Sequence, residues 1–158
     1  MRTLRTTLLA FVCAALASGA ELATRKALTL SAAKEMAAAA EAEARKNNWN
    51  VVICIVDESG HLIYLQRMDE TQLASIDIAQ GKAKTAALYK RPTKALEDAV
   101  AGGRAVVMRL PGVMPVEGGL PITVEGRIIG GIGVSGVQSV QDAQIARAAL
   151  VVVEKPSK

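Results

Sequence analysis

Small apolar residues recur at intervals of three and four positions in three segments of the chain. This spacing places them on one side of a helix and predicts helices over 29–45, 71–90 and 139–153. The exposed side of the second helix is expected to carry Lys82, Lys84 and Lys90. Pro92 cannot continue the second helix, so a short separate helix capped by Thr93 is expected to follow it.

Two pairs of short segments rich in β-branched residues alternate with these helices. The pair 50–57 and 61–67 and the pair 120–124 and 127–134 each flank a short turn, which predicts two β-hairpins. The segment 50–57 is apolar almost throughout, as is typical of a strand buried on both faces. Hairpins interleaved with helices predict an α+β fold in which helices cover one antiparallel sheet.

The segment 102–119 has no hydrophobic periodicity and is interrupted by glycine and proline. Irregular segments of this length in a compact domain are usually functional, so we expect a binding loop or lid. Glu117 lies in this segment and is the candidate acid–base residue if the protein is an enzyme.

The first twenty residues have the organisation of a secretory signal peptide. Two arginines precede an apolar run over 8–17, and small residues at Ser18 and Ala20 provide a cleavage site. Because the run is too short to span a bilayer, we expect cleavage after Ala20. This leaves a single domain over 21–158, without a membrane span, in the periplasm or outside the cell.

Charge, aromatic content and cysteine content exclude several classes of function. The chain has 19 basic and 15 acidic residues, an excess too small to indicate nucleic acid as a partner. Aromatic residues make up 3% of the chain, which leaves few rings to stack on bases or sugars. Cys13 lies in the predicted signal, and Cys54 lies in the apolar strand, where a buried structural thiol is expected. One histidine and one buried cysteine do not make a usual zinc site.

The glycine-rich sequence GGIGVSG at 130–136 does not have the context of a nucleotide-binding loop. Such a loop follows a parallel strand and opens a helix, whereas these glycines lie in a hairpin strand. A strand with so little side-chain bulk permits close approach of another backbone or a ligand. We therefore expect room beside this strand for a flat ligand or a second protomer.

Residues with ligand chemistry gather around the first predicted hairpin. His61 is the only histidine and opens a strand beside a turn, where we expect it to be partly exposed. It is either an ordinary surface histidine or a lone axial ligand to a haem iron. Met68 is either an alternative soft ligand or a packing residue. Arg67 either pairs with Asp69 or holds a ligand carboxylate through bidentate contacts.

Six short sequence motifs, taken together and in their order along the chain, resemble the GlcG/HbpS-type haem-binding family, which includes the C-terminal domain of PduO-type proteins. The motifs are VDESGHL at 56–62, RMD at 67–69, AQGKAKTA at 79–86, GGLP at 118–121, GIGVSG at 131–136 and QD at 141–142. The resemblance covers 28–150. It implies a profilin-like α/β/α sandwich that assembles into dimers or octamers.

The resemblance also implies haem or a related tetrapyrrole as the ligand. His61 is the expected metal ligand, and Met68, the hydroxyl of Thr123 or a residue across a subunit interface are the alternatives. Some family members use a histidine on the first helix, which this chain lacks. Arg67 and Lys82 are expected to hold the propionates. The expected cofactor-binding residues are His61, Arg67, Met68, Lys82, Glu117, Gly118 and Gly119.

Three functions are consistent with these features. The first is an exported, homo-oligomeric binding protein for haem or a related tetrapyrrole, with a regulatory or protective role. The second is an enzyme acting on a small carboxylate metabolite, with Glu117 as acid–base residue and Arg67 or Lys82 as the carboxylate clamp. The third is an accessory protein that docks on a sensor or transporter. The resemblance favours binding over catalysis.

Overall fold

The computed structural model describes residues 20–154 of the chain, so the predicted signal peptide lies almost entirely outside the described residues. Within this range the predicted helices and hairpins are confirmed, with ends that differ by a few residues. The elements are α1 (Leu30–Lys46), β1 (Val52–Asp57), β2 (Leu62–Arg67), α2 (Ser75–Tyr89), α3 (Thr93–Ala101), the 3-10 helix η1 (Ala105–Arg109), β3 (Gly119–Val124), β4 (Arg127–Ser135) and α4 (Ser139–Glu154).

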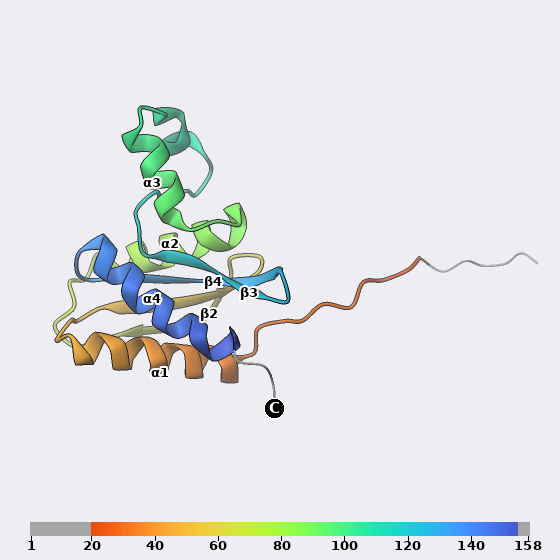
Figure 1. The fold of residues 1–158 in the computed structure, drawn as a ribbon, viewed down its shortest axis with the longest axis horizontal. Coiled ribbons are helices and arrows are strands. Elements are labelled where there is room, and N and C mark those ends of the chain that lie inside the picture. The colour runs from red at the N-terminus through yellow and green to blue at the C-terminus, as the bar shows by residue number, and fades with distance from the viewer. Residues whose placement is uncertain (1–19, 155–158) are drawn as a thin grey trace, which may run out of the picture.

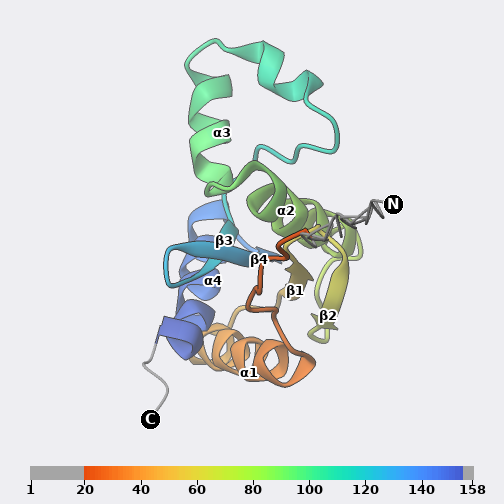
Figure 2. The same cartoon turned by 90° about the vertical axis from the view of Figure 1, so that its right-hand side faces the viewer.

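The four strands form one antiparallel sheet in the order β2-β1-β4-β3. β1 lies between β2 and β4, and its residues Val52 to Val56 are all buried, as its apolar sequence predicts. Helices α1 and α4 cover one face of the sheet and α2 covers the other (Figures 1 and 2). The predicted α+β fold, with helices on both faces of one antiparallel sheet, is therefore confirmed. Within the described range no helix is long and apolar enough to cross a membrane.

The face under α1 and α4 carries the larger part of the hydrophobic core. Thr29 caps α1, because its hydroxyl accepts a hydrogen bond of 3.2 Å from the backbone N–H of Ala32. The helix then places alanines and one methionine against isoleucines and valines of the sheet. The fully buried members of this cluster are Ala33, Met36, Ala40, Ala44, Val51, Ile53, Ile55, Ile122, Ile132, Val134, Ile145, Ala146 and Ala149. Each large aliphatic side chain buried here contributes about 1.5–3 kcal/mol to stability.

On the opposite face, α2 packs directly on the glycines of β4. A Cβ atom added at Gly133 would lie 2.1 Å from the carbonyl oxygen of Ala79, and one at Gly131 would lie 2.3 Å from that of Ala83. Both glycines are buried. The expectation of open space for a flat ligand beside this strand is therefore wrong, because the protein's own helix fills that space. The glycines serve helix–sheet packing.

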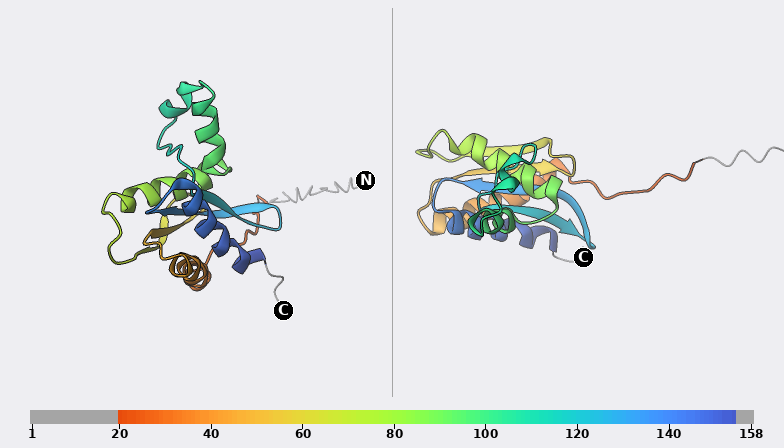
Figure 3. Two further views of the ribbon diagram at one scale, coloured as in Figure 1. Left: turned by 60° about the vertical axis from the view of Figure 1, so that its left-hand side comes forward. Right: turned by 90° about the horizontal axis from the view of Figure 1, so that it is seen from above.

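Residues 93–118 form an arm whose helices α3 and η1 stand away from the sheet and its covering helices (Figure 3). Its returning segment contacts α2, where the backbone N–H of Met114 donates a hydrogen bond of 2.8 Å to Thr85 Oγ1. The arm contains α3, η1 and the segment that returns to β3. The predicted irregular segment thus includes one short 3-10 helix. Thr93 does not cap α3 as expected: the N-cap is Pro92, and the Thr93 hydroxyl accepts a hydrogen bond of 2.9 Å from the backbone N–H of Gly119. Thr93 therefore fastens the base of the arm to β3.

Candidate functional site

His61 lies on the turn between β1 and β2, with a side chain that is 82% exposed. Asp57 fixes this turn, because its Oδ1 accepts hydrogen bonds from the backbone N–H groups of Ser59 (2.8 Å) and His61 (2.9 Å). Asp57 Oδ2 lies 3.8 Å from His61 Nδ1. This distance is too long for a hydrogen bond, so Asp57 lies beside the imidazole as a nearby carboxylate and the ring is open to solvent. The expected exposure of His61 is confirmed.

The surface next to His61 is apolar and bordered by a cation. A Cβ atom added at Gly60 would lie 3.0 Å from Lys84 Cγ and 3.4 Å from Leu88 Cδ1, so the turn rests on the C-terminal half of α2. Leu62 and Leu88 are both exposed. The His61 turn therefore presents a nitrogen ligand beside exposed aliphatic side chains and an ammonium group.

The other predicted residues of the first hairpin lie at the far end of β2 from His61. Arg67 ends this strand and is exposed, and within residues 20–154 neither Arg67 nor Asp69 takes part in an ion pair. Met68 is 7% exposed and belongs to the core under α1. Of the two roles expected for this residue, the structure therefore supports packing rather than metal ligation. The structure therefore does not bring Arg67 and Met68 together with His61.

Lys82 is 1% exposed and forms an ion pair of 2.8 Å with Asp142, which is 2% exposed. Its ammonium group also donates a hydrogen bond of 3.0 Å to the carbonyl of Val134. The expectation that Lys82 lies on the exposed side of its helix is wrong. A buried lysine that already neutralises a buried aspartate is not placed to hold a ligand's propionate at the protein surface.

The Asp142 carboxyl group is subject to two opposing effects on its pKa and accepts a second hydrogen bond. Burial raises the pKa of its carboxyl group above the usual value, while the hydrogen bond and charge of Lys82 act in the opposite direction. Its Oδ1 also accepts a hydrogen bond of 3.3 Å from the backbone N–H of Val137. Asp142 thus links the start of α4 to α2 by its ion pair with Lys82.

Gly118 and Gly119, which were expected to bind a cofactor, cover this ion pair. A Cβ atom added at Gly118 would lie 2.7 Å from Lys82 Nζ, and one at Gly119 would lie 2.5 Å from the Lys82 carbonyl oxygen. Glu117, immediately before them, is half-buried, and its backbone N–H donates to the Glu97 carboxylate. These residues lie close to Lys82 but on the arm side of the molecule, separate from the His61 turn.

Cys54 is buried in β1, as expected. Burial raises the pKa of its thiol to about 12. Because Cys54 is fully buried, its thiol is a structural core group rather than an accessible nucleophile or iron ligand.

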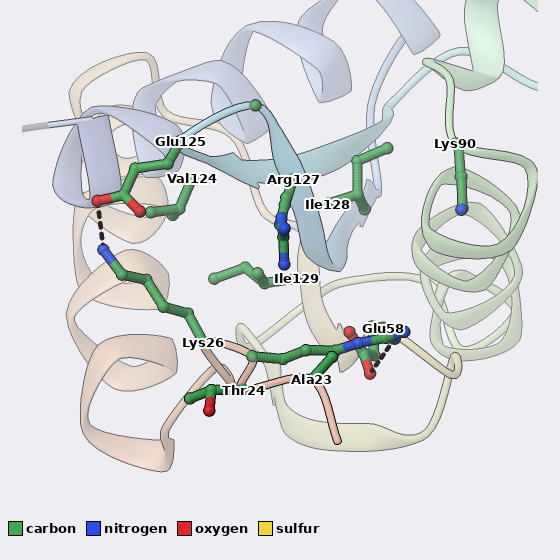
Figure 4. A pocket seen from close by; sticks show the side chains of 12 residues that line it. Ala23, Thr24, Lys26, Glu58, Lys90, Val124, Glu125, Arg127, Ile128 and Ile129 are labelled. Atoms are coloured by element: carbon green, nitrogen blue, oxygen red, sulfur yellow. Dashed lines mark hydrogen bonds and ion pairs between the residues drawn. The ribbon is translucent and has the colours of Figure 1, made fainter. Parts of the chain in front are cut away.

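A pocket of about 850 Å³ opens at the end of the sheet that carries both hairpin turns. Its walls come from three places: the extended segment before α1, the β3–β4 hairpin, and the His61 turn with the end of α2. Figure 4 shows Arg127 and Lys90 pointing into the opening from two of these walls. The lining residues are Ala23, Thr24, Arg25, Lys26, Glu58, Lys90, Val124, Glu125, Gly126, Arg127, Ile128 and Ile129.

The charge of this pocket is positive. Four cationic side chains and two carboxylates line it. Both carboxylates are paired: Arg25 with Glu58 at 3.7 Å and Lys26 with Glu125 at 2.5 Å. Sequence reasoning missed this site, because it assembles residues from four separate segments that share no motif.

Comparisons with known proteins agree with the fold. The profile of the family described as "Haem degrading protein HbpS-like" matches residues 28–151. Protein GlcG of Escherichia coli is 44% identical over 112 residues, which are 71% of this chain and 84% of GlcG.

Two solved structures extend the similarity to three dimensions. A crystal structure of a double mutant of Streptomyces reticuli HbpS superposes with a TM-score of 0.80 at 35% identity, covering 88% of this chain and 95% of that one. A crystal structure of a PduOC–haem complex gives a TM-score of 0.75 at 31% identity, covering 82% of this chain and 96% of that one. The chain therefore belongs to the HbpS-like haem-degrading protein family.

Proposed function

We propose that this protein is an exported, homo-oligomeric haem-binding protein whose His61 ligates the haem iron through Nε2. The observation that carries the proposal is the exposed imidazole of His61, with the Asp57 carboxylate nearby, on a turn that also supplies Glu58 to the wall of a positively charged pocket of about 850 Å³. The haem complex of a relative with the same fold supports the choice of ligand. Export rests on the predicted signal peptide.

The residues around His61 fit a haem group. Haem requires as little as one protein ligand, apolar surface for its ring, and cations for its propionates. His61 offers the nitrogen, and Leu62 and Leu88 offer exposed apolar surface beside it. Met68 and Cys54 are buried in the core, whereas the exposed Met108 lies on η1 of the arm. When bound, haem would supply iron-centred ligand and redox chemistry; His61 would hold it in place.

Titration with hemin tests the role of His61. The wild-type protein is expected to sharpen and shift the Soret band of hemin as the imidazole coordinates the iron. His61→Ala is expected to lose this change and to bind hemin at least about tenfold more weakly, because the bond to the iron is lost. Absorbance spectra recorded during the titration provide both readouts.

Tyr64→Phe serves as the control, since Tyr64 lies on β2 just after the His61 turn and its hydroxyl donates a hydrogen bond of 3.2 Å to Gln66 Oε1. Unchanged spectra in His61→Ala, with a normal thermal transition, would rule out His61 as the ligand.

The arm supports the proposed homo-oligomer. Val106 and Met108 on η1 are each 60% exposed, and Leu110 follows them with 38% exposure. Side chains of this type on a projecting element are typical of surfaces that pack against another subunit. We therefore propose that the arm contacts a second copy of the chain.

Charged substitutions on the arm test this contact. The double variant Val106→Asp, Met108→Asp is expected to shift the assembly toward monomers. Each apolar side chain contributes about 1.5–3 kcal/mol when it is buried in the contact, and burying a carboxylate in its place costs more than this. Light scattering coupled to size-exclusion chromatography measures the mass. Val151→Asp, at an exposed site on α4, is the control and should leave the mass unchanged. An unchanged mass in the arm variant would contradict the proposed interface.

A further inference from the structure

The pocket at the end of the sheet has two cations that the protein leaves without a counter-ion. Lys90 follows the last residue of α2, and Arg127 follows the β3–β4 turn; both are exposed. Neither takes part in an ion pair within residues 20–154, although the other two cations of the pocket each pair with a carboxylate. The lining therefore carries a net charge of about +2 directed into one concave space.

The two cations project from different elements toward the same opening (Figure 4). Lys90 is held in a left-handed backbone conformation with φ of 54°, and Arg127 pairs with Val124 across the hairpin turn. Their backbone positions are thus fixed before any ligand binds. Ile128, which also lines the pocket, adds apolar surface between them (Figure 4). Such a site suits a ligand with an apolar body and two anionic groups.

We propose that this pocket binds a pair of carboxylate groups through Lys90 and Arg127. The identity of the ligand rests on the proposed function: in a haem-binding protein these carboxylates are the two propionates. This assignment replaces Lys82, whose ammonium group is buried against Asp142. The recognition chemistry is the same for a small free dicarboxylate, so the experiment must separate the two sources.

Hemin, hemin dimethyl ester and succinate are the three probes. Lys90→Ala and Arg127→Ala are each expected to weaken hemin binding by about tenfold, since each removes a charge-assisted contact. The dimethyl ester, which has the same ring and no carboxylates, should bind wild type and variants equally. Glu125→Gln, which removes an acid from the pocket, should tighten hemin binding. Absorbance titration measures the porphyrins, and calorimetry measures succinate.

Lys34→Ala and Arg147→Ala are matched controls. Both remove an exposed positive charge, but from α1 and α4 on the opposite face of the sheet. They should leave hemin affinity unchanged apart from a small effect of net charge that disappears at high salt.

The outcomes separate failure of the pocket from failure of haem binding. Hemin binding that is equal in wild type and in the Lys90 and Arg127 variants would overturn the carboxylate site and leave haem binding standing. A lower melting temperature in Lys90→Ala with unchanged affinity would also overturn it, because Lys90 would then only offset the C-terminal dipole of α2. If wild type binds no hemin but binds succinate through Lys90 and Arg127, the carboxylate site stands and the haem proposal fails. Binding of neither probe would overturn both.

Discussion

Gly133→Ala is expected to destabilise the protein by about 3 kcal/mol or more, enough to leave much of it unfolded. The added Cβ atom would lie 2.1 Å from the carbonyl oxygen of Ala79 and 2.4 Å from the backbone nitrogen of Ala83. These are backbone atoms of α2, so no side-chain rotation relieves the overlap. The helix would have to lift from the sheet and lose its packing on Val52, Cys54 and Val56. Urea denaturation followed by circular dichroism measures the loss.

Gly81→Ala is the matched control for this substitution. Gly81 lies on α2, and the atoms nearest to the added Cβ atom would be Cε and Cβ of Met114, at 3.1 and 3.2 Å, rather than backbone atoms. The gain in helix propensity, about 1 kcal/mol, should offset the small shift of that side chain. A Gly133→Ala variant as stable as Gly81→Ala would show that α2 does not pack on β4 as described.

Lys82→Met is expected to cost about 3–5 kcal/mol at pH 7, because it leaves the Asp142 carboxylate buried without a partner. The substitution keeps the aliphatic length of the side chain, so the loss reports charge rather than volume. The double variant Lys82→Met, Asp142→Leu should recover much of the stability, since neither charge then remains buried. Thermal and urea unfolding of the wild type, single and double variants give the comparison.

The pH dependence of the Lys82→Met penalty separates the ion pair from simple misfit. Burial already raises the pKa of Asp142 in the wild type, and Lys82 opposes this. Without Lys82 the pKa rises further above the usual 3.8, so the folded variant binds a proton at a pH where the unfolded chain has not yet done so. Folded-state stability therefore increases as the pH falls from 7 toward this range. Lys34→Met, at an exposed site, should show neither loss nor pH effect. A penalty that is constant with pH would contradict an unpaired Asp142 carboxylate.

Hydrophobic periodicity predicted the elements and their order because each one buries a single face. The apolar run of β1 identified a strand covered on both sides, and the alanine stripe of α2 identified the face that packs on it. The base of the arm was harder to predict. Thr93 has the chemistry of a cap, but Pro92 takes that position and the Thr93 hydroxyl bonds to Gly119, a contact between residues far apart in sequence.

Two site predictions were wrong for a related reason. The glycines of β4 indicated close approach, but a sequence pattern does not say whether a ligand or the protein's own helix approaches. Lys82 was placed on the exposed side of α2 because it is charged. Lys82 lies three residues after Ala79, so helical spacing places it on the same buried face of α2. A lysine on a buried face needs a buried acidic partner. Asp142, sixty positions later, could be identified only in the folded chain.

The most direct test of haem binding at His61 is a crystal structure of the protein after hemin loading. We expect the iron to be bonded to His61 Nε2, the ring to lie against Leu62 and Leu88, and the propionates to point toward Lys90 and Arg127. An iron ligated by another residue, such as Thr123, or a haem bound over α1 and α4, would contradict the proposed site.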